Sequence, residues 1–94
     1  MSLPDVKQWS ALALYMRPSC PYCVRVTQFS SEAGIPLTLC NISEGSHLEA
    51  LMVGGGKRQV PCLRIEATPG EVQWLYESMD IIAYLQRQQA LITA

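Results

Sequence analysis

The sequence predicts an α/β fold in which one four-stranded mixed sheet is flanked by about three helices. An apolar run of strand length at 11–16 is followed by a helical pattern and by a second strand-like run at 36–41. Such a strand, helix and strand form a right-handed crossover with parallel strands. Two later strand-like runs flank a turn, which predicts an antiparallel hairpin, and a last helical pattern follows. We expect one domain over residues 1–94, with its core at about 11–89.

The composition is that of a globular domain with little net charge. The chain has 94 residues, 49% of them apolar and 16% charged, and its formal net charge is -1. This length supports one packed core, and the balance of residues excludes a disordered chain. Nothing favours binding to nucleic acid or to an anionic membrane, and no apolar run is long enough to span a bilayer. The first ten residues lack the pattern of a secretory signal, so we expect a cytoplasmic protein, and a monomer.

The first half of the chain supplies the crossover. The run ALALYM (11–16) fits a central strand that is buried on both faces. Gly34 is expected to end the following helix, and PLTLCN (36–41) is predicted to be the second strand. The helix predicted over 21–33 has an apolar stripe of helical spacing, formed by Tyr22, Val26, Phe29 and Ala33.

The second half supplies a short helix, the hairpin and the last helix. The short helix is predicted around 47–52, and the glycine run at 54–56 is expected to end it. The runs VPCLRIE (60–66) and EVQWLYE (71–77) are predicted to be strands that flank the turn ATPG. The last helix is predicted over 78–89, with its first residue as the N-cap. Its inward-facing residues are expected to be Met79, Ile81, Ile82 and Leu85.

The stretch RPSCPYC (17–23) places two cysteines three residues apart at the start of the first helix. Pro21 suits the first helical position, which makes Cys20 the N-cap. Unpaired first-turn N–H groups and the helix dipole then favour the thiolate, so the pKa of Cys20 should fall below the ~8.5 of a free cysteine. Cys23 lies in the first turn, is less exposed, and can reach Cys20. The pattern predicts a nucleophilic Cys20 and a resolving Cys23 in thiol–disulfide exchange.

Half of a zinc site is the alternative interpretation of such a pair. A four-ligand zinc site usually has a second close pair of Cys or His, whereas Cys40, Cys62 and His47 are dispersed along the chain. The strands that carry Cys40 and Cys62 are expected to flank the first strand rather than each other. We therefore expect no metal site, two buried spectator cysteines and an exposed His47.

The order of three motifs resembles that of the glutaredoxin family. These motifs are RPSCPYC after a strand, KRQVPCL (57–63), and a polar pair that opens the last helix. The resemblance covers about 11–89. It implies a thioredoxin-like fold and a glutathione-dependent thiol–disulfide oxidoreductase that reduces protein disulfides and glutathione mixed disulfides. Glutathione would be the co-substrate, and disulfide-bonded or glutathionylated proteins would be the partners.

The resemblance also assigns residues to a glutathione site. Pro61 would be cis and face the active-site sulfur, which leaves the backbone of Val60 free to pair with the cysteinyl part of glutathione. Arg17 would bind the glycyl carboxylate and favour the nearby thiolate. Lys57 or Arg58 would assist it. For all three cations, a solvated surface position is the alternative.

The start of the last helix departs from the glutaredoxin pattern of glycines followed by acidic residues. The stretch YESMDIIAYL (76–85) is more similar to the N-terminal domain of glutathione transferases. Ser78 would bind the γ-glutamyl α-carboxylate, or only cap the helix, and Glu77 would bind the α-amino group. Asp80 most simply complements the helix dipole. Tyr22 would edge the glutathione groove, although partial packing on the helix explains it as well.

Two other functions stay open. Some glutaredoxins carry a [2Fe–2S] cluster that two chains share through the first active-site cysteine and glutathione, but Pro21 between the cysteines is more similar to the redox enzymes. A glutathione transferase domain that acts on electrophiles is the other alternative. It would leave the paired cysteines surplus, and the all-helical second domain of the transferases is missing from these 94 residues.

Overall fold

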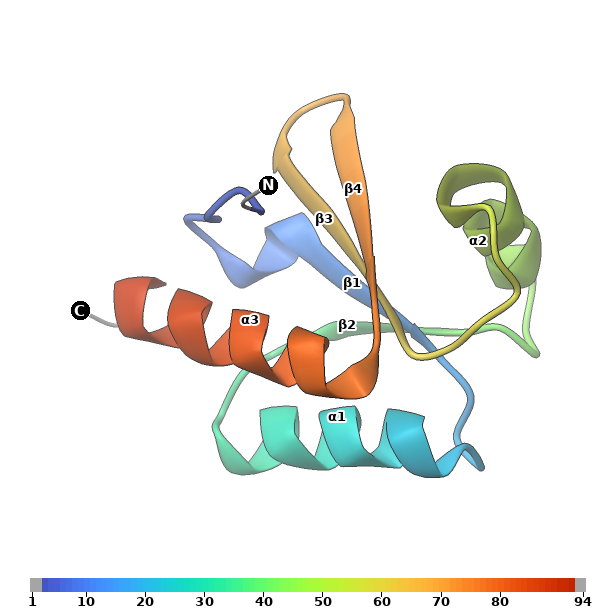
Figure 1. The fold of residues 1–94 in the computed structure, drawn as a ribbon, viewed down its shortest axis with the longest axis horizontal. Helices are drawn as coiled ribbons and strands as arrows, with labels where there is room; N and C mark the ends of the chain where they lie inside the picture. The colour runs from blue at the N-terminus through green and yellow to red at the C-terminus, as the bar shows by residue number, and fades with distance from the viewer. Residues whose placement is uncertain (1–2, 93–94) are drawn as a thin grey trace.

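Strand β1 (Leu12–Met16) lies in the interior of the sheet, as its apolar sequence predicts. In the computed structural model, which describes residues 3–92, the strand order is β2-β1-β3-β4 (Figure 1). β1 pairs in parallel with β2 (Thr38–Asn41) and antiparallel with β3 (Cys62–Thr68). β3 in turn pairs antiparallel with β4 (Glu71–Tyr76). The predicted four-stranded mixed sheet is therefore confirmed.

Three α-helices complete the fold. Helices α1 (Pro21–Glu32) and α3 (Ser78–Ile92) run side by side, and α2 (His47–Gly55) lies apart from them (Figure 1). A short 3-10 turn, η1 (Trp9–Ala11), leads into β1. Within residues 3–92, no helix has the combination of length and hydrophobicity that a membrane span requires.

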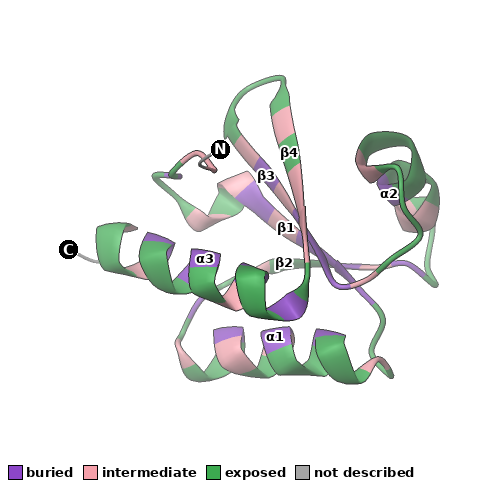
Figure 2. Cartoon of the chain, viewed as in Figure 1, coloured by how far each residue is buried: buried purple, intermediate pink, exposed green. Residues whose placement is uncertain are grey.

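The sheet separates two apolar layers. Because side chains alternate along a strand, Leu12, Leu14 and Met16 of β1 join the core with α1 and α3, whereas Tyr15 joins a smaller cluster with Leu51 of α2. Figure 2 shows the buried positions of α1 on the side that faces α3 and the sheet, while its opposite side is exposed. β1 is thus buried from both faces, as predicted.

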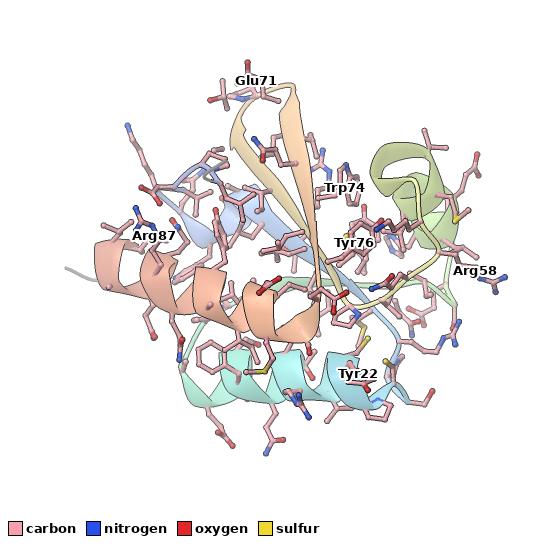
Figure 3. All side chains as sticks on the ribbon, in the orientation of Figure 1. Tyr22, Arg58, Glu71, Trp74, Tyr76 and Arg87 are labelled. Carbon is pink, nitrogen blue, oxygen red and sulfur yellow. The ribbon has the colours of Figure 1, made fainter. Side chains whose placement is uncertain are left out.

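Helix α2 is longer than predicted. The glycine run was expected to end it, yet Gly54 and Gly55 are its last two residues, and Gly56, with φ of 80°, forms the C-cap. Packing explains the difference, because a Cβ on Gly54 would collide with the Trp74 ring and one on Gly55 with the Tyr76 hydroxyl. Both aromatic residues extend from β4 toward α2 (Figure 3). The glycines therefore let the helix approach β4 closely.

Helix α3 begins where predicted but is capped by a different residue. The N–H of Ile81 donates to the carbonyl of Glu77, so Glu77 occupies the N-cap and Ser78 is the first helical residue. Met79 was predicted to face inward but is 60% exposed, whereas Ile81 and Leu85 are fully buried. At 100° per residue, Met79 lies on the side of the helix opposite to Ile81, and this spacing outweighs its apolar character.

The segment before β1 is also part of the fold, although it lies outside the predicted core. Val6 is buried, and its N–H donates to Oε1 of Gln88 at 2.8 Å. The hydroxyl of Tyr84 donates to the carbonyl of Pro4 at 2.7 Å. These contacts tie the segment to α3, which extends past its predicted end at Gln89.

Candidate functional site

The two cysteines of the CPYC motif lie at the N-terminal end of α1, directly after β1. Pro21 is the first residue of the helix, and Cys20, with extended backbone, is the N-cap, as predicted. Both cysteines are free thiols. Cys20 is partly exposed, whereas Cys23 has no exposed surface. Attack on a substrate is therefore open to Cys20 alone of the two.

The environment of Cys20 favours its thiolate. Burial raises the pKa of Cys20, but the N–H and the thiol of Cys23 lower it. The N–H of Tyr22 and the positive charge of Arg17 lower it further, and the net pKa lies below that of an ordinary cysteine. No first-turn N–H closes a complete capping hydrogen bond to the sulfur, so these amides act as nearby dipoles. The predicted direction of the pKa shift is confirmed.

The environment of Cys23 has the opposite effect. Burial raises the pKa of Cys23 to about 11, and this rise is opposed by the N–H of Arg17, which donates to Sγ of Cys23 at 3.4 Å. The nearby Cys20 thiol raises this pKa further. Cys23 therefore stays protonated near neutral pH, and the two cysteines form an asymmetric pair.

A groove of about 600 Å³ lies between the start of α1, the loop before β3 and the start of α3, and we call it the α1–α3 groove. The Val60–Pro61 peptide bond in its wall is cis, as predicted. The structure brings five of the predicted site residues together in the walls of this groove: Tyr22, Val60, Pro61, Glu77 and Ser78. Tyr22 is 59% exposed, so it edges the groove instead of extending the buried stripe of α1.

Four further residues line the groove and were not predicted as ligand contacts: Arg25, Gln59, Met79 and Asp80. Arg25 follows Tyr22 by three positions, and this helical spacing is the one signal that places it on the same face. Nε2 of Gln59 donates to Oε1 of Glu77 at 3.4 Å, which links the loop before the cis-proline to the start of α3.

Ser78 and the first turn of α3 form the end of the groove opposite to α1. Ser78 is only 7% exposed and yet lines the groove. As the first helical residue, it belongs to a turn whose N–H groups have no partner within the helix. Glu77 holds a left-handed backbone with φ of 75°, which few residues other than glycine adopt. Such free amides favour a carboxylate at this place.

The predicted cations Arg17, Lys57 and Arg58 do not line the groove. Arg17 is exposed, and its backbone N–H donates to Sγ of Cys23. The ammonium of Lys57 lies 5.2 Å from the centre of the Tyr76 ring. Arg58 points outward from the molecule (Figure 3). Their binding to a glutathione carboxylate stays a prediction.

The other two cysteines lie on the α2 side of the sheet. Cys40 and Cys62 pair in register with Tyr15 from opposite sides, so their strands flank β1 as predicted. Both are buried, and burial raises the pKa of each, that of Cys62 to about 11. His47 was expected to be exposed but is half-buried, because its ring lies edge-on 6.1 Å from that of Tyr15. Within residues 3–92, no group of three or more His, Cys, Asp or Glu could hold a metal ion.

A parallel β1-α1-β2 unit, a hairpin after a cis-proline and two cysteines at the N-terminus of α1 define a thioredoxin-like domain. Residues 14–91 match the family described as glutathione S-transferase, N-terminal domain, and the chain belongs to this family. The likeness to glutathione transferases therefore extends well beyond the stretch at 76–85 that suggested it.

Two solved structures share this fold. A glutaredoxin from wheat is 22% identical, with a TM-score of 0.63, over 88% of this chain and 79% of that one. The Leishmania protein TDR1, a trimeric glutathione transferase, is 23% identical, with a TM-score of 0.63, over 82% of this chain. The match spans only 17% of the TDR1 chain. A comparison with curated protein sequences gave no match. The predicted thioredoxin-like fold of a glutaredoxin is confirmed.

Proposed function

We propose that this chain is a glutathione-dependent thiol–disulfide oxidoreductase in which Cys20 is the nucleophile and Cys23 resolves. The asymmetry of the cysteine pair is the observation that carries the proposal. Cys20 is accessible and its pKa is lowered, whereas Cys23 is buried with a pKa of about 11. A thiolate attacks a disulfide far faster than a thiol does, so the two residues have separate roles.

In the first reaction the substrate is a glutathione mixed disulfide. The Cys20 thiolate attacks the glutathionyl sulfur, the substrate S–S bond breaks, and the substrate leaves as a thiolate. A second glutathione, as thiolate, then attacks the glutathionyl sulfur on Cys20. Oxidised glutathione leaves and the Cys20 thiolate is restored. Cys23 takes no part in this cycle.

In the second reaction the substrate is a protein disulfide. Cys20 attacks one sulfur and forms a mixed disulfide with the substrate, whose other sulfur leaves as a thiolate. Cys23 loses its proton as it attacks Cys20, which releases the reduced substrate and leaves a Cys20–Cys23 disulfide. Two glutathione molecules then reduce this disulfide and are oxidised to glutathione disulfide.

The α1–α3 groove supports glutathione as the co-substrate. The backbone of Val60 lies in the groove wall beside the cis-proline, which supports its pairing with the cysteinyl part of the ligand. The N–H groups of the first α3 turn and the hydroxyl of Ser78 suit the γ-glutamyl α-carboxylate, and the carboxylate of Glu77 suits the α-amino group. Membership of a glutathione transferase domain family supports the same ligand.

A turnover assay tests the proposal. The substrate is the mixed disulfide of glutathione with a small thiol, and glutathione reductase couples its reduction to NADPH oxidation. We expect turnover that depends on glutathione and is unchanged in Cys40→Ser, which alters a buried cysteine on the other face of the sheet. A folded, reduced protein without turnover would contradict the proposal.

A second candidate function follows from the family match. A glutathione transferase domain uses the bound glutathione thiolate to attack an electrophile, and the same groove would hold the thiol. Conjugation of glutathione to an aryl halide, followed by absorbance, tests this activity. It would be independent of Cys23, and its appearance without mixed-disulfide reduction would favour the transferase.

A further inference from the structure

Arg25 places one guanidinium in the α1–α3 groove, and no acidic group among residues 3–92 pairs with it. It extends from the second turn of α1, and its Nη1 lies 3.8 Å from Sδ of Met79 in the first turn of α3. Its Cζ lies 5.8 Å from the centre of the Tyr22 ring. In the described part of the chain, the salt bridges are those of Arg64 and Arg87. Arg25 is thus held across the groove by weak contacts only.

The charges that line the groove determine how well it can bind a ligand carboxylate, and the Arg25 guanidinium is one of these charges. Among the described residues that line the groove, Arg25 is the only cation, and Glu77 and Asp80 are both acidic. A carboxylate that approaches the first turn of α3 meets these two negative charges together with the free amides. A carboxylate that is bound by the amides alone is repelled by Asp80 even when Glu77 pairs with the α-amino group of the ligand. A guanidinium at the same end offsets one negative charge.

We propose that Arg25 is a specificity-determining residue whose guanidinium binds the α-carboxylate at the γ-glutamyl end of glutathione, together with the first-turn amides of α3. The inference rests on the proposed function, because it takes glutathione as the ligand. Binding replaces a weak contact with the Met79 sulfur by charge-assisted hydrogen bonds, and the planar guanidinium matches a carboxylate with two parallel bonds.

Single-turnover kinetics on two mixed disulfides test this role. One substrate is a fluorescent reporter peptide whose cysteine carries glutathione. The other carries the same tripeptide without its γ-glutamyl α-carboxylate. In both reactions the Cys20 thiolate breaks the substrate S–S bond and forms a new one with the tripeptide, and the reporter leaves as a thiolate. The release of the reporter is followed by fluorescence.

Arg25→Ala is expected to slow the reaction with the glutathionylated reporter about 10-fold, which corresponds to one lost charge-assisted contact. The reaction with the substrate that lacks the carboxylate should stay within about 2-fold of the wild type, because the partner of the guanidinium is absent there. Arg25→Lys keeps the charge without the planar fork and should show an intermediate loss. Lys7→Ala removes an exposed cation outside the groove and controls for net charge.

Three results would overturn the inference. An equal loss on both substrates would assign Arg25 to another step or another carboxylate, and no loss on either would remove it from binding. In both cases the wild type reacts, so the proposed oxidoreductase function stands. A wild type that reacts with neither substrate would overturn the function and the inference together. Arg25 is exposed, and circular dichroism of each variant verifies that the fold is kept.

Discussion

At the scale of single residues, the chemistry depends on the different exposure and pKa of two cysteines at the start of one helix. Cys20 precedes the helix, near its free amides and the charge of Arg17, whereas Cys23 faces the core between α1 and the sheet. The spacing of three residues brings the sulfurs together while leaving one accessible and one enclosed. Different reactivity therefore follows from position alone.

This asymmetry predicts a difference in alkylation. When wild-type protein reacts with iodoacetamide at increasing pH, the midpoint for Cys20 should lie below that of a free cysteine in the same assay, because its pKa is lowered. Cys23 should remain unmodified well above that pH, since burial raises its pKa to about 11 and encloses the sulfur. Peptide mass spectrometry separates the two sites.

Arg17→Ala tests the charge contribution to the same titration. Removal of a positive charge beside the sulfur disfavours the thiolate, so the Cys20 midpoint should rise. Arg58→Ala removes a cation that points outward and should leave the midpoint in place. A wild-type midpoint at or above that of a free cysteine would contradict an activated Cys20.

At the scale of elements, most helices and strands could be predicted, because each has a hydrophobic period and a local stop signal. β1, α1 and the hairpin are of this kind. The extent of α2 could not be predicted, since Gly54 and Gly55 are explained by Trp74 and Tyr76 of β4, which lie far away in the sequence. The N-cap of α3 is Glu77 instead of the predicted Ser78. Glu77 has a left-handed backbone, which is rare outside glycine, so its sequence gives no signal for this position.

The close approach of α2 to β4 gives a prediction for stability. Gly54→Ala should lower the free energy of unfolding by about 1–3 kcal/mol, because the added Cβ collides with the Trp74 ring and forces a shift in a packed interface. Urea denaturation followed by circular dichroism measures the change. Val53→Ala is the matched control: it alters a side chain that is 81% exposed on the same helix and should change stability by about 0.5 kcal/mol or less.

If Gly54→Ala raised the free energy of unfolding, or changed it no more than Val53→Ala does, α2 and β4 would not be in close contact. Mixed-disulfide reduction should persist in the folded variant, since α2 lies on the face of the sheet away from α1.

At the scale of the whole molecule, the candidate site is made by elements that meet only after folding. The CPYC motif and the Val60–Pro61 pair could be found from the sequence because both are local patterns. Gln59 could not, because it lines a groove between α1, a loop and α3. For Arg25, the helical spacing from Tyr22 indicates the shared face of α1 but not the groove that this face lines. The N-terminal segment was missed for the same reason, since Val6 has its partner, Gln88, near the other end of the chain.

The contact between the two ends of the described chain predicts a further loss of stability. Gln88 is fully buried, its Oε1 accepts from the N–H of Val6 and its Nε2 donates to Oδ1 of Asp5 at 3.0 Å. Gln88→Ala leaves the buried N–H of Val6 unpaired and should cost about 1–3 kcal/mol. Gln86→Ala, at an exposed position of the same helix, is the control. Equal urea midpoints for the two variants would show that the segment does not stabilise the fold.

The separate roles of the two cysteines are the central claim, and one comparison tests them most directly. Cys20→Ser and Cys23→Ser are each assayed for reduction of a glutathione mixed disulfide and of a protein disulfide, with glutathione as the reductant. Cys20→Ser should abolish both reactions. Cys23→Ser should retain the first and lose most of the second, because only the second needs a resolving thiol. Equal loss of the first reaction in the two variants would contradict the assignment of Cys20 as the nucleophile and Cys23 as the resolving cysteine.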